Sequence, residues 1–368
     1  MPASDPRPAC LLTGIVSPYR REPFRLLAEA EHVEVIAHEY AGPPIPGLTV
    51  HRTSEAGAVR LAASGRYRAV IAGLDGRIAL PGAYAAARLR GVPFVLWATI
   101  WAHPHTPAHA LSFLPTRHLY RAADAVATYG PHVSRYVERY RGRADGIVVA
   151  PQAVDVDHFA AAVPEADRAA ARECAGGPGT ELLVLYAGRL VREKGIEALT
   201  AAWRWADLGA GARLAIAGGG PLEQTLERDL PGARLLGHVN PGDLPALYAA
   251  ADVLVLPSIH TASFREPWGL VVNEAMLQHT PVVASNAVGA AAGGLVRDGR
   301  NGFVVPAGDA EALATRLRLL AGDAGLRDRL GAAAREDAAA YTPSAWAAGM
   351  GRALAAAGAG RGGGGRDC

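Results

Sequence analysis

Lysine is almost absent from this sequence. Its 368 residues include 36 arginines and one lysine, Lys194, so one position keeps a compact ammonium group where the chain otherwise uses guanidinium. Cysteine is also scarce: Cys10, Cys174 and Cys368 lie far apart and form no C-x-x-C pair. This argues against a disulfide framework and a cysteine-based zinc site, and favours the reducing cytoplasm as the location.

Long hydrophobic runs are missing as well. The first apolar run, ACLLTGIV at 9–16, is too short for a membrane span and lacks the basic flank and cleavage site of a signal peptide. We expect it to be a buried strand. With 50% hydrophobic, 20% charged and 6% aromatic residues, the composition is typical of a globular chain.

Charge is divided unevenly along the chain. Residues 1–150 contain 17 arginines and 11 acidic residues, whereas the remainder contains 20 basic and 24 acidic residues. A basic N-terminal half favours an anionic partner or a peripheral contact with a membrane, although a general preference for arginine explains it about as well.

Short apolar runs alternate with alanine-rich stretches, a pattern typical of parallel sheets covered by helices. Candidate strands lie at 10–16, 33–37, 69–73, 93–99, 125–130 and 146–150, and a second series begins at 182. We predict an α/β fold of two Rossmann-like parallel-sheet domains facing each other across a cleft. The predicted segments are an N-terminal domain at 1–155, a C-terminal domain at 156–340, a helix at 341–357 packing back on the N-terminal domain, and a disordered glycine-rich tail at 358–368.

The lysine lies in GRLVREKG, 188–195, between a predicted strand and a helical stretch. Ligands of parallel sheets bind beyond the carboxyl ends of the strands, where Arg189 and Lys194 could together hold a phosphate group. A solvated turn is the alternative. Neither G-x-x-x-x-G-K-[ST] nor G-x-G-x-x-G after a strand is present, which argues against a P-loop and against the usual dinucleotide site.

The stretch REPWGLVVNEAM, 265–276, predicts a second anion-binding element. Pro267 is a favoured first-turn residue, and Gly269 and Leu270 would begin a helix whose free N–H groups meet an anion. Glu266 and Glu274 would supply two carboxylates for sugar and ribose hydroxyls.

In this order, GRLVREKG, AGGGP, LLGHV, LYAAADVLVLPS, REPWGLVVNEAM, TPVVAS and LVRDGRNGFVVPAGD resemble the retaining GT-B glycosyltransferases of glycosyltransferase family 4, also called glycosyl transferases group 1. The motifs cover most of 180–310, whereas the N-terminal half matches only through GIVSPYRREPF and PQAVDVDHF. The resemblance implies that the N-terminal domain binds the acceptor and the C-terminal domain the donor.

The resemblance also implies residue roles. Arg189 and Lys194 would bind the donor diphosphate, with Gly14, Gly269 and Leu270; Glu266 would act at the donor sugar, beside Pro267 and Trp268; Glu274 would hold the ribose, and backbone at His238 and Val239 the base. Trp268 stands where the family usually has phenylalanine, so we expect a narrower or differently shaped sugar pocket.

The family often has a histidine or an acid after the strand that corresponds to PFVLWAT, but this chain has Ala98 and Thr99 there. Among the nearby His103, His105 and His109, we select His103 as the catalytic candidate because it is closest to the strand end; a surface histidine is the alternative. We assign no metal to Asp155 and Asp157, which match the family's crossover segment.

The implied function is transfer of a sugar from a nucleoside diphosphate sugar, with UDP as the expected leaving group, to an acceptor hydroxyl with retention of configuration. Such a hexosyltransferase-type enzyme needs no metal and no cofactor, and its acceptor could be a small molecule, a lipid-linked sugar or a glycan. No nucleic acid is expected as partner. A GT-B epimerase, a pyridoxal-phosphate phosphorylase and a non-catalytic nucleotide-sugar-binding protein are the alternatives.

Overall fold

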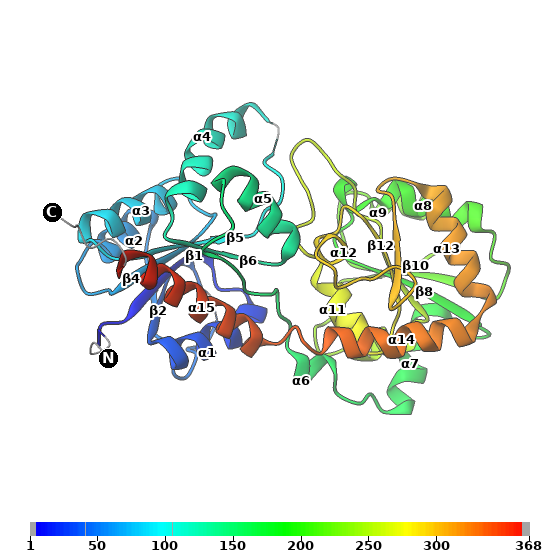
Figure 1. Cartoon of the computed structure of the whole chain (residues 1–368). Coiled ribbons are helices and arrows are strands. Elements are labelled where there is room, and N and C mark those ends of the chain that lie inside the picture. The colour runs from blue at the N-terminus through cyan, green and yellow to red at the C-terminus, as the bar shows by residue number, and fades with distance from the viewer. Residues whose placement is uncertain (1–4, 41, 105, 363–368) are drawn as a thin grey trace. The chain divides into compact units, whose positions relative to one another are not determined.

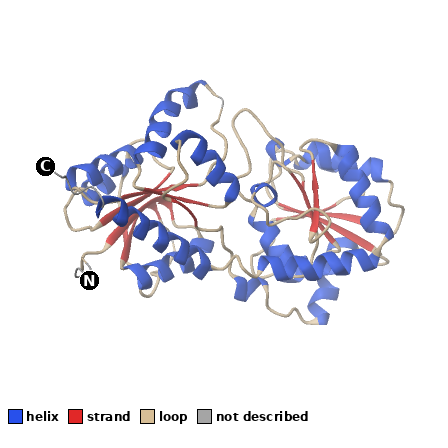
Figure 2. Cartoon of the chain, in the orientation of Figure 1, coloured by secondary structure: helices blue, strands red, loops and turns tan. Residues whose placement is uncertain are grey.

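The computed structural model describes residues 5–40, 42–104 and 106–362. The chain divides into two compact units, which we call unit 1 (1–153 and 342–368) and unit 2 (154–341). Figure 1 shows the course of the chain, and Figure 2 shows that helices surround the strands of each unit.

Unit 1 is built on a parallel sheet of seven strands in the order β3-β2-β1-β4-β5-β6-β7. Its central strands are continuous apolar runs because both faces of a parallel sheet are covered. The strand bounds are β1 Ala9–Ile15, β2 Val33–Glu39, β3 Val50–Arg52, β4 Ala69–Gly73, β5 Phe94–Ala98, β6 Ala125–Thr128 and β7 Ile147–Val149.

The helices of unit 1 include one from the far end of the chain. Helix α15 packs against α1 and against β5, β6 and β7. The ring of Trp346 lies 5.5 Å from that of Phe24 and 5.4 Å from that of Trp97. The bounds are η1 Pro18–Arg20, α1 Arg21–Glu31, α2 Glu55–Ala62, α3 Ala79–Arg90, α4 Pro107–Ala122, α5 Pro131–Arg141 and α15 Pro343–Gly362.

Helix α15 continues beyond the predicted helix at 341–357. Residues 358–362 are helical, although their glycine content predicted a disordered tail, because the helix propagates from a well-packed start at Trp346. Residues 363–368 lie outside the described residues, as does His105.

Unit 2 contains a parallel sheet of six strands in the order β10-β9-β8-β11-β12-β13. The strand bounds are β8 Leu182–Ala187, β9 Ala212–Ala217, β10 Arg234–Gly237, β11 Val253–Leu256, β12 Val282–Ser285 and β13 Gly302–Val305. Its helices are α6 Val156–Phe159, α7 Glu165–Gly176, η2 Arg192–Lys194, α8 Ile196–Ala206, α9 Glu223–Asp229, α10 Leu244–Ala250, α11 Leu270–Leu277, α12 Gly289–Ala292, α13 Ala310–Gly322 and α14 Ala324–Ala338.

The predicted α/β class with two Rossmann-like parallel sheets is confirmed. In each sheet the strand order reverses once, between β1 and β4 in unit 1 and between β8 and β11 in unit 2. At such a reversal the loops on its two sides diverge and leave a crevice beyond the carboxyl ends of the strands, which is where ligands bind in open α/β sheets.

Candidate functional site

The reversal in unit 2 brings the predicted motifs together. Residues 188–195 follow β8, and the segment that begins at Pro257 follows its neighbour β11. The two loops touch through their backbones: a Cβ on Gly195 would lie 1.9 Å from the carbonyl oxygen of Pro257, and Ile259 N donates to Glu193 O at 2.9 Å. Gly195 has φ 74°, so both its conformation and its crowding require glycine.

Lys194 and Glu266 form an ion pair inside this junction. The Lys194 ammonium donates to Glu266 Oε2, and Ser258 Oγ donates to the same oxygen at 3.3 Å. Their side chains are 12% and 9% exposed. Loss of one partner would leave an uncompensated charge in a largely buried place.

Arg189 stands at the edge of the same loop. Its carbonyl oxygen accepts a hydrogen bond of 2.8 Å from the buried Tyr186 hydroxyl, and burial keeps the pKa of Tyr186 far above its ordinary value, so this donor stays protonated. The guanidinium is 67% exposed, with Glu193 3.9 Å away. The loop therefore presents an outward cation on a fixed backbone.

The start of α11 forms the opposite side of the junction. Gly269 precedes the helix with φ 94°, and a Cβ there would lie 2.7 Å from Leu256 Cδ2. Leu270 opens the helix, whose first turn contains no acidic residue. The segment before Gly269 packs against the start of α12. Ala290 N donates a hydrogen bond of 2.8 Å to Trp268 O, and a Cβ on Gly289 would lie 2.0 Å from the Pro267 carbonyl oxygen.

The indole of Trp268 lies inside unit 2. It is 2% exposed, its Nε1 donates to Asn273 Oδ1 at 2.7 Å, and its ring lies 5.5 Å from that of Tyr341. Burial with a partner for its N–H suits a large aromatic side chain; the role of Trp268 at the donor sugar stays a prediction. The backbone of Trp268 remains on the loop.

Glu274 lies within α11 and is partly buried. Its Oε2 accepts a hydrogen bond of 2.7 Å from Tyr248 of α10. Burial raises the pKa of Glu274 to about 7, although the Tyr248 hydrogen bond acts in the opposite direction. The carboxyl group therefore changes charge near neutral pH.

His238 and Val239 directly follow β10, the strand at the edge of the sheet. His238 is exposed. The adjacent Gly237 carbonyl accepts from Gly218 N at 2.7 Å, which ties this segment to the glycine-rich loop after β9. The predicted base-binding backbone thus follows the carboxyl end of its strand, as the predicted diphosphate loops after β8 and β11 do.

Two predicted residues belong to unit 1. Gly14 lies within β1, and its ideal Cβ position is 2.0 Å from Oδ2 of Asp75. A carboxylate therefore lies beside the Gly14 backbone, and the contact of Gly14 with the diphosphate stays a prediction. His103 follows β5; its ring lies 5.1 Å from that of Phe113, and its Nε2 is 3.5 Å from Ser112 Oγ.

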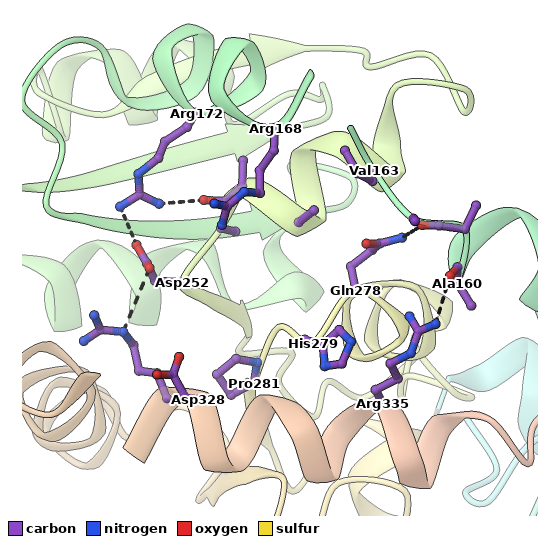
Figure 3. Close-up of a pocket in the computed structure, with 16 residues that line it drawn as sticks. Ala160, Val163, Arg168, Arg172, Asp252, Gln278, His279, Pro281, Asp328 and Arg335 are labelled. Atoms are coloured by element: carbon purple, nitrogen blue, oxygen red, sulfur yellow. Dashed lines mark hydrogen bonds and ion pairs between the residues drawn. The ribbon is translucent and has the colours of Figure 1, made fainter. Parts of the chain in front are cut away.

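A cavity of about 490 Å³ lies elsewhere in unit 2, and Figure 3 shows its lining. Asp252 and Pro281, which immediately precede β11 and β12, place it at the amino ends of the strands. Its arginines bind protein groups: Arg172 donates to Asp252 at 2.8 Å, and Arg335 to Ala160 O at 3.0 Å. We interpret this cavity as a structural junction, not the ligand site.

Sequence reasoning missed Tyr248 and Ser258, which bond the two glutamates, and Asp75 beside Gly14. Ser258 carried a usable signal, since it is a hydroxyl directly beyond the apolar run VLVLP. Asp155 has a local role, because its side chain accepts from His158 N at 3.0 Å and caps α6.

The two sheets, each reversing at its first strand, define the GT-B class of folds, and comparisons with known proteins agree. Anabaena HepE in complex with UDP superposes with a TM-score of 0.76 at 21% identity, covering 95% of this chain and 99% of that one. Residues 167–337 match the family model of glycosyl transferases group 1. Unit 2 therefore belongs to the glycosyl transferases group 1 family.

Curated relatives are similar over part of their length. The sulfoquinovosyl transferase SQD2 of Arabidopsis thaliana is 30% identical over 275 residues, 71% of this chain and 51% of the relative. The D-inositol 3-phosphate glycosyltransferase of Xylanimonas cellulosilytica is 38% identical over 230 residues, 58% of this chain and 52% of the relative. The chain spans about half the length of these relatives.

Proposed function

We propose that this chain is a glycosyltransferase that moves a sugar from a UDP-sugar to an acceptor hydroxyl, with retention of configuration. The observation that carries the proposal is the ion pair of Lys194 and Glu266 at the reversal of the unit 2 sheet. It joins a cation and a carboxylate at the place where a nucleoside diphosphate sugar would put its phosphates and its sugar.

In this proposal the leaving diphosphate meets Lys194, Arg189 and the start of α11. Its negative charge grows as the bond to the sugar breaks, so fixed cations and backbone N–H groups stabilise the transition state more than the ground state. Glu266 accepts hydrogen bonds from donor-sugar hydroxyls. In the front-face mechanism generally proposed for the retaining enzymes that this chain resembles, the leaving phosphate takes the acceptor proton, so no protein base is needed.

The proposed nucleotide is UDP. HepE, whose fold this chain shares, was solved in complex with UDP. We assign the ribose to Glu274 and the base to backbone at His238 and Val239, which lie at the same sheet edge. The hydroxyl of Tyr248 fixes the Glu274 carboxylate, and ribose hydroxyls would donate to its remaining lone pairs.

We assign acceptor binding to unit 1 and propose that the reaction takes place in the cytoplasm. Membrane contact through the basic half of the chain is a further part of the proposal, since arginine-rich surfaces are attracted to anionic lipid. Within the described ranges, no helix is long and apolar enough to cross a membrane.

The test is a screen of nucleotide sugars by thermal shift, followed by product analysis. A ligand that binds the native state raises apparent stability by mass action, and the expected ligand is a UDP-sugar. Magnetic resonance of the product then reports its anomeric configuration, with retention expected. An epimerised donor sugar formed without acceptor would favour the epimerase, and binding without transfer or hydrolysis would favour a nucleotide-sugar sensor.

A further inference from the structure

Arg20 is a partly buried cation at the carboxyl edge of the unit 1 sheet. It ends η1, which follows β1. Its guanidinium lies 4.6 Å from the ring centre of Trp97, and its Nη2 donates to the hydroxyl of Tyr129 at 2.9 Å. A third contact, from Nη1 to Thr13 Oγ1, is at the limit of 3.5 Å.

These contacts leave much of the guanidinium's donor capacity unused. Five N–H groups are available on an arginine side chain. The hydrogen bonds to Tyr129 and Thr13 end on hydroxyls, and the ring of Tyr19, whose centre is 5.5 Å from the guanidinium, is a further contact without a formal negative charge. Nε of Arg20 is enclosed and has no hydrogen-bond partner among the described residues. None of the ion pairs found in the described part of the chain includes Arg20.

Arg141, in the same unit, shows what a structural arginine looks like in this protein. It is buried, and its guanidinium donates to the carbonyl oxygens of Tyr120, Ala123, Asp124 and Asp145, at 2.8, 2.9, 3.3 and 3.2 Å. Arg20 makes no comparable set of bonds. Since removing a cation from water is costly unless charge or hydrogen bonds compensate it, the difference calls for a function.

The aromatic support fixes the direction of Arg20. The Trp97 ring lies under the guanidinium, and Tyr129 follows β6 and is itself buried. Burial raises the pKa of Tyr129 to about 12, so its hydroxyl stays neutral near physiological pH. Arg20 is thus held in place by groups that do not neutralise its charge.

Among the described residues, the carboxylate of Asp75 forms no ion pair with Arg20. Asp75 lies in the Cβ direction of Gly14, whereas Arg20 contacts the side chain of the preceding residue, Thr13. Successive residues of a strand point to opposite faces of the sheet. The cation and the carboxylate therefore belong to opposite faces at the end of β1.

We propose that Arg20 binds an anionic group, a phosphate or a carboxylate, carried by the acceptor. The inference rests on the proposed function, which assigns the acceptor to unit 1, and it narrows the acceptor to an acidic class. A planar guanidinium forms paired, charge-assisted hydrogen bonds with either oxyanion. A cavity of about 10 Å³ beside Arg20 has room for roughly one water molecule. Because this cavity is too small for a phosphate or a carboxylate, the anion would approach the guanidinium from outside the cavity.

The experiment titrates inorganic phosphate and acetate into the full chain in the presence of saturating UDP, which fills the diphosphate loops of unit 2. Calorimetry compares the wild type with Arg20→Gln and Arg20→Lys. We expect Arg20→Gln to weaken binding of at least one anion roughly tenfold or more. Arg20→Lys keeps the positive charge but loses the planar guanidinium that forms paired hydrogen bonds, so its loss of anion affinity should be smaller.

Arg21→Gln is the matched control, because Arg21 donates to Pro43 O at 3.0 Å on the surface of the same unit; its anion affinity should equal that of the wild type. If the wild type binds neither anion, or if Arg20→Gln binds both normally, the proposal is wrong. A loss of thermal stability with normal anion binding would assign Arg20 a structural role. Failure of UDP to bind would count against the proposed function instead. In that case, titration without UDP would still compare the anion affinity of Arg20→Gln with that of the wild type.

Discussion

Lys194 occupies a place that suits an ammonium group better than a guanidinium. Its charge lies against Glu266, in a junction where the backbone of Gly195 touches that of Pro257. An ammonium is a compact point charge, whereas a guanidinium is a wide planar fork. In a chain with 36 arginines, this steric limit gives a physical reason for the one lysine.

The first prediction concerns this pair. Lys194→Ala and Lys194→Arg should each lower kcat/KM by at least about tenfold, equivalent to ~1.4 kcal/mol of transition-state stabilisation. Lys194→Ala should also destabilise the fold, because Glu266 keeps a charge without a partner. Steady-state kinetics and denaturant unfolding measure the two effects.

Adding Glu266→Gln to Lys194→Ala separates stability from catalysis. The double variant should recover part of the lost stability, since no unpaired charge remains, but none of the activity. Additive stability losses would show that the two residues do not form a coupled pair.

The second prediction concerns the pH dependence caused by Glu274. Burial raises its pKa from the ordinary 4.5 to about 7 in the folded protein, so the folded state binds the proton more tightly than the unfolded chain does. Stability contributed by this proton is present below about pH 4.5 and is lost as the pH rises to 7, by up to about 3 kcal/mol.

Glu274→Gln should remove this slope while keeping a similar shape. The measurement is the unfolding free energy of both proteins between pH 5 and pH 8, with the difference between them narrowing or reversing as the pH rises. Parallel curves would contradict the raised pKa.

At the scale of elements, glycine positions decide how closely the loops and helices can approach. Two features at the start of α11 require glycine at position 269. Its φ of 94° lies in the left-handed region, and a Cβ there would lie too close to Leu256. If the first turn of this helix binds phosphate, as proposed, its position depends on that glycine.

The third prediction tests this point. Gly269→Ala should destabilise unit 2 by about 1–3 kcal/mol and should weaken UDP binding, because the left-handed backbone and the crowding both oppose a side chain. Gly299→Ala is the control: its φ is 72°, and its Cβ would meet nothing within 4 Å. It should share the backbone strain but keep UDP affinity. Equal UDP affinities in both variants would argue against α11 as the phosphate site.

Much of the arrangement of elements could be predicted from the sequence, because buried parallel strands are continuous apolar runs, as in LLVLYA and VLVL. Strand β3 was missed since its three residues, VHR, have no apolar pattern. The motifs placed Lys194 and Glu266 at one edge, but their direct pairing across 72 residues of sequence depends on three-dimensional packing. The same holds for the inward indole of Trp268 and for the Tyr248 hydroxyl on Glu274.

At the scale of the whole molecule, the chain leaves unit 1 after residue 153 and returns to it at 342. The returning helix α15 inserts Trp346, which is 2% exposed, beside Phe24 and Trp97. Unit 1 is therefore completed by the last segment of the chain, although its sheet is encoded by the first.

The fourth prediction follows from that connectivity. Trp346→Ala should destabilise unit 1 by about 3–5 kcal/mol, the usual cost of removing a large buried aromatic side chain. UDP binding should persist, since the proposed nucleotide site lies in unit 2. Hydrogen exchange resolved by peptide, together with UDP calorimetry, measures both. A larger increase in exchange rate over the wild type in β8–β13 than in β1–β7 would contradict the assignment of α15 to unit 1.

The last prediction concerns how the molecule supplies positive charge to the donor. In the proposed site, Lys194, Arg189 and the start of α11 neutralise the diphosphate, so transfer should continue at an undiminished rate in excess EDTA. An enzyme whose cation bridges the phosphates would stop under that treatment. The control is Lys194→Ala assayed with added magnesium. A divalent ion should not rescue it, because the missing charge belongs to a side chain at a fixed place in the loop. If chelation abolished transfer in the wild type and magnesium or manganese restored it, these side chains would not be the main source of charge for the leaving group.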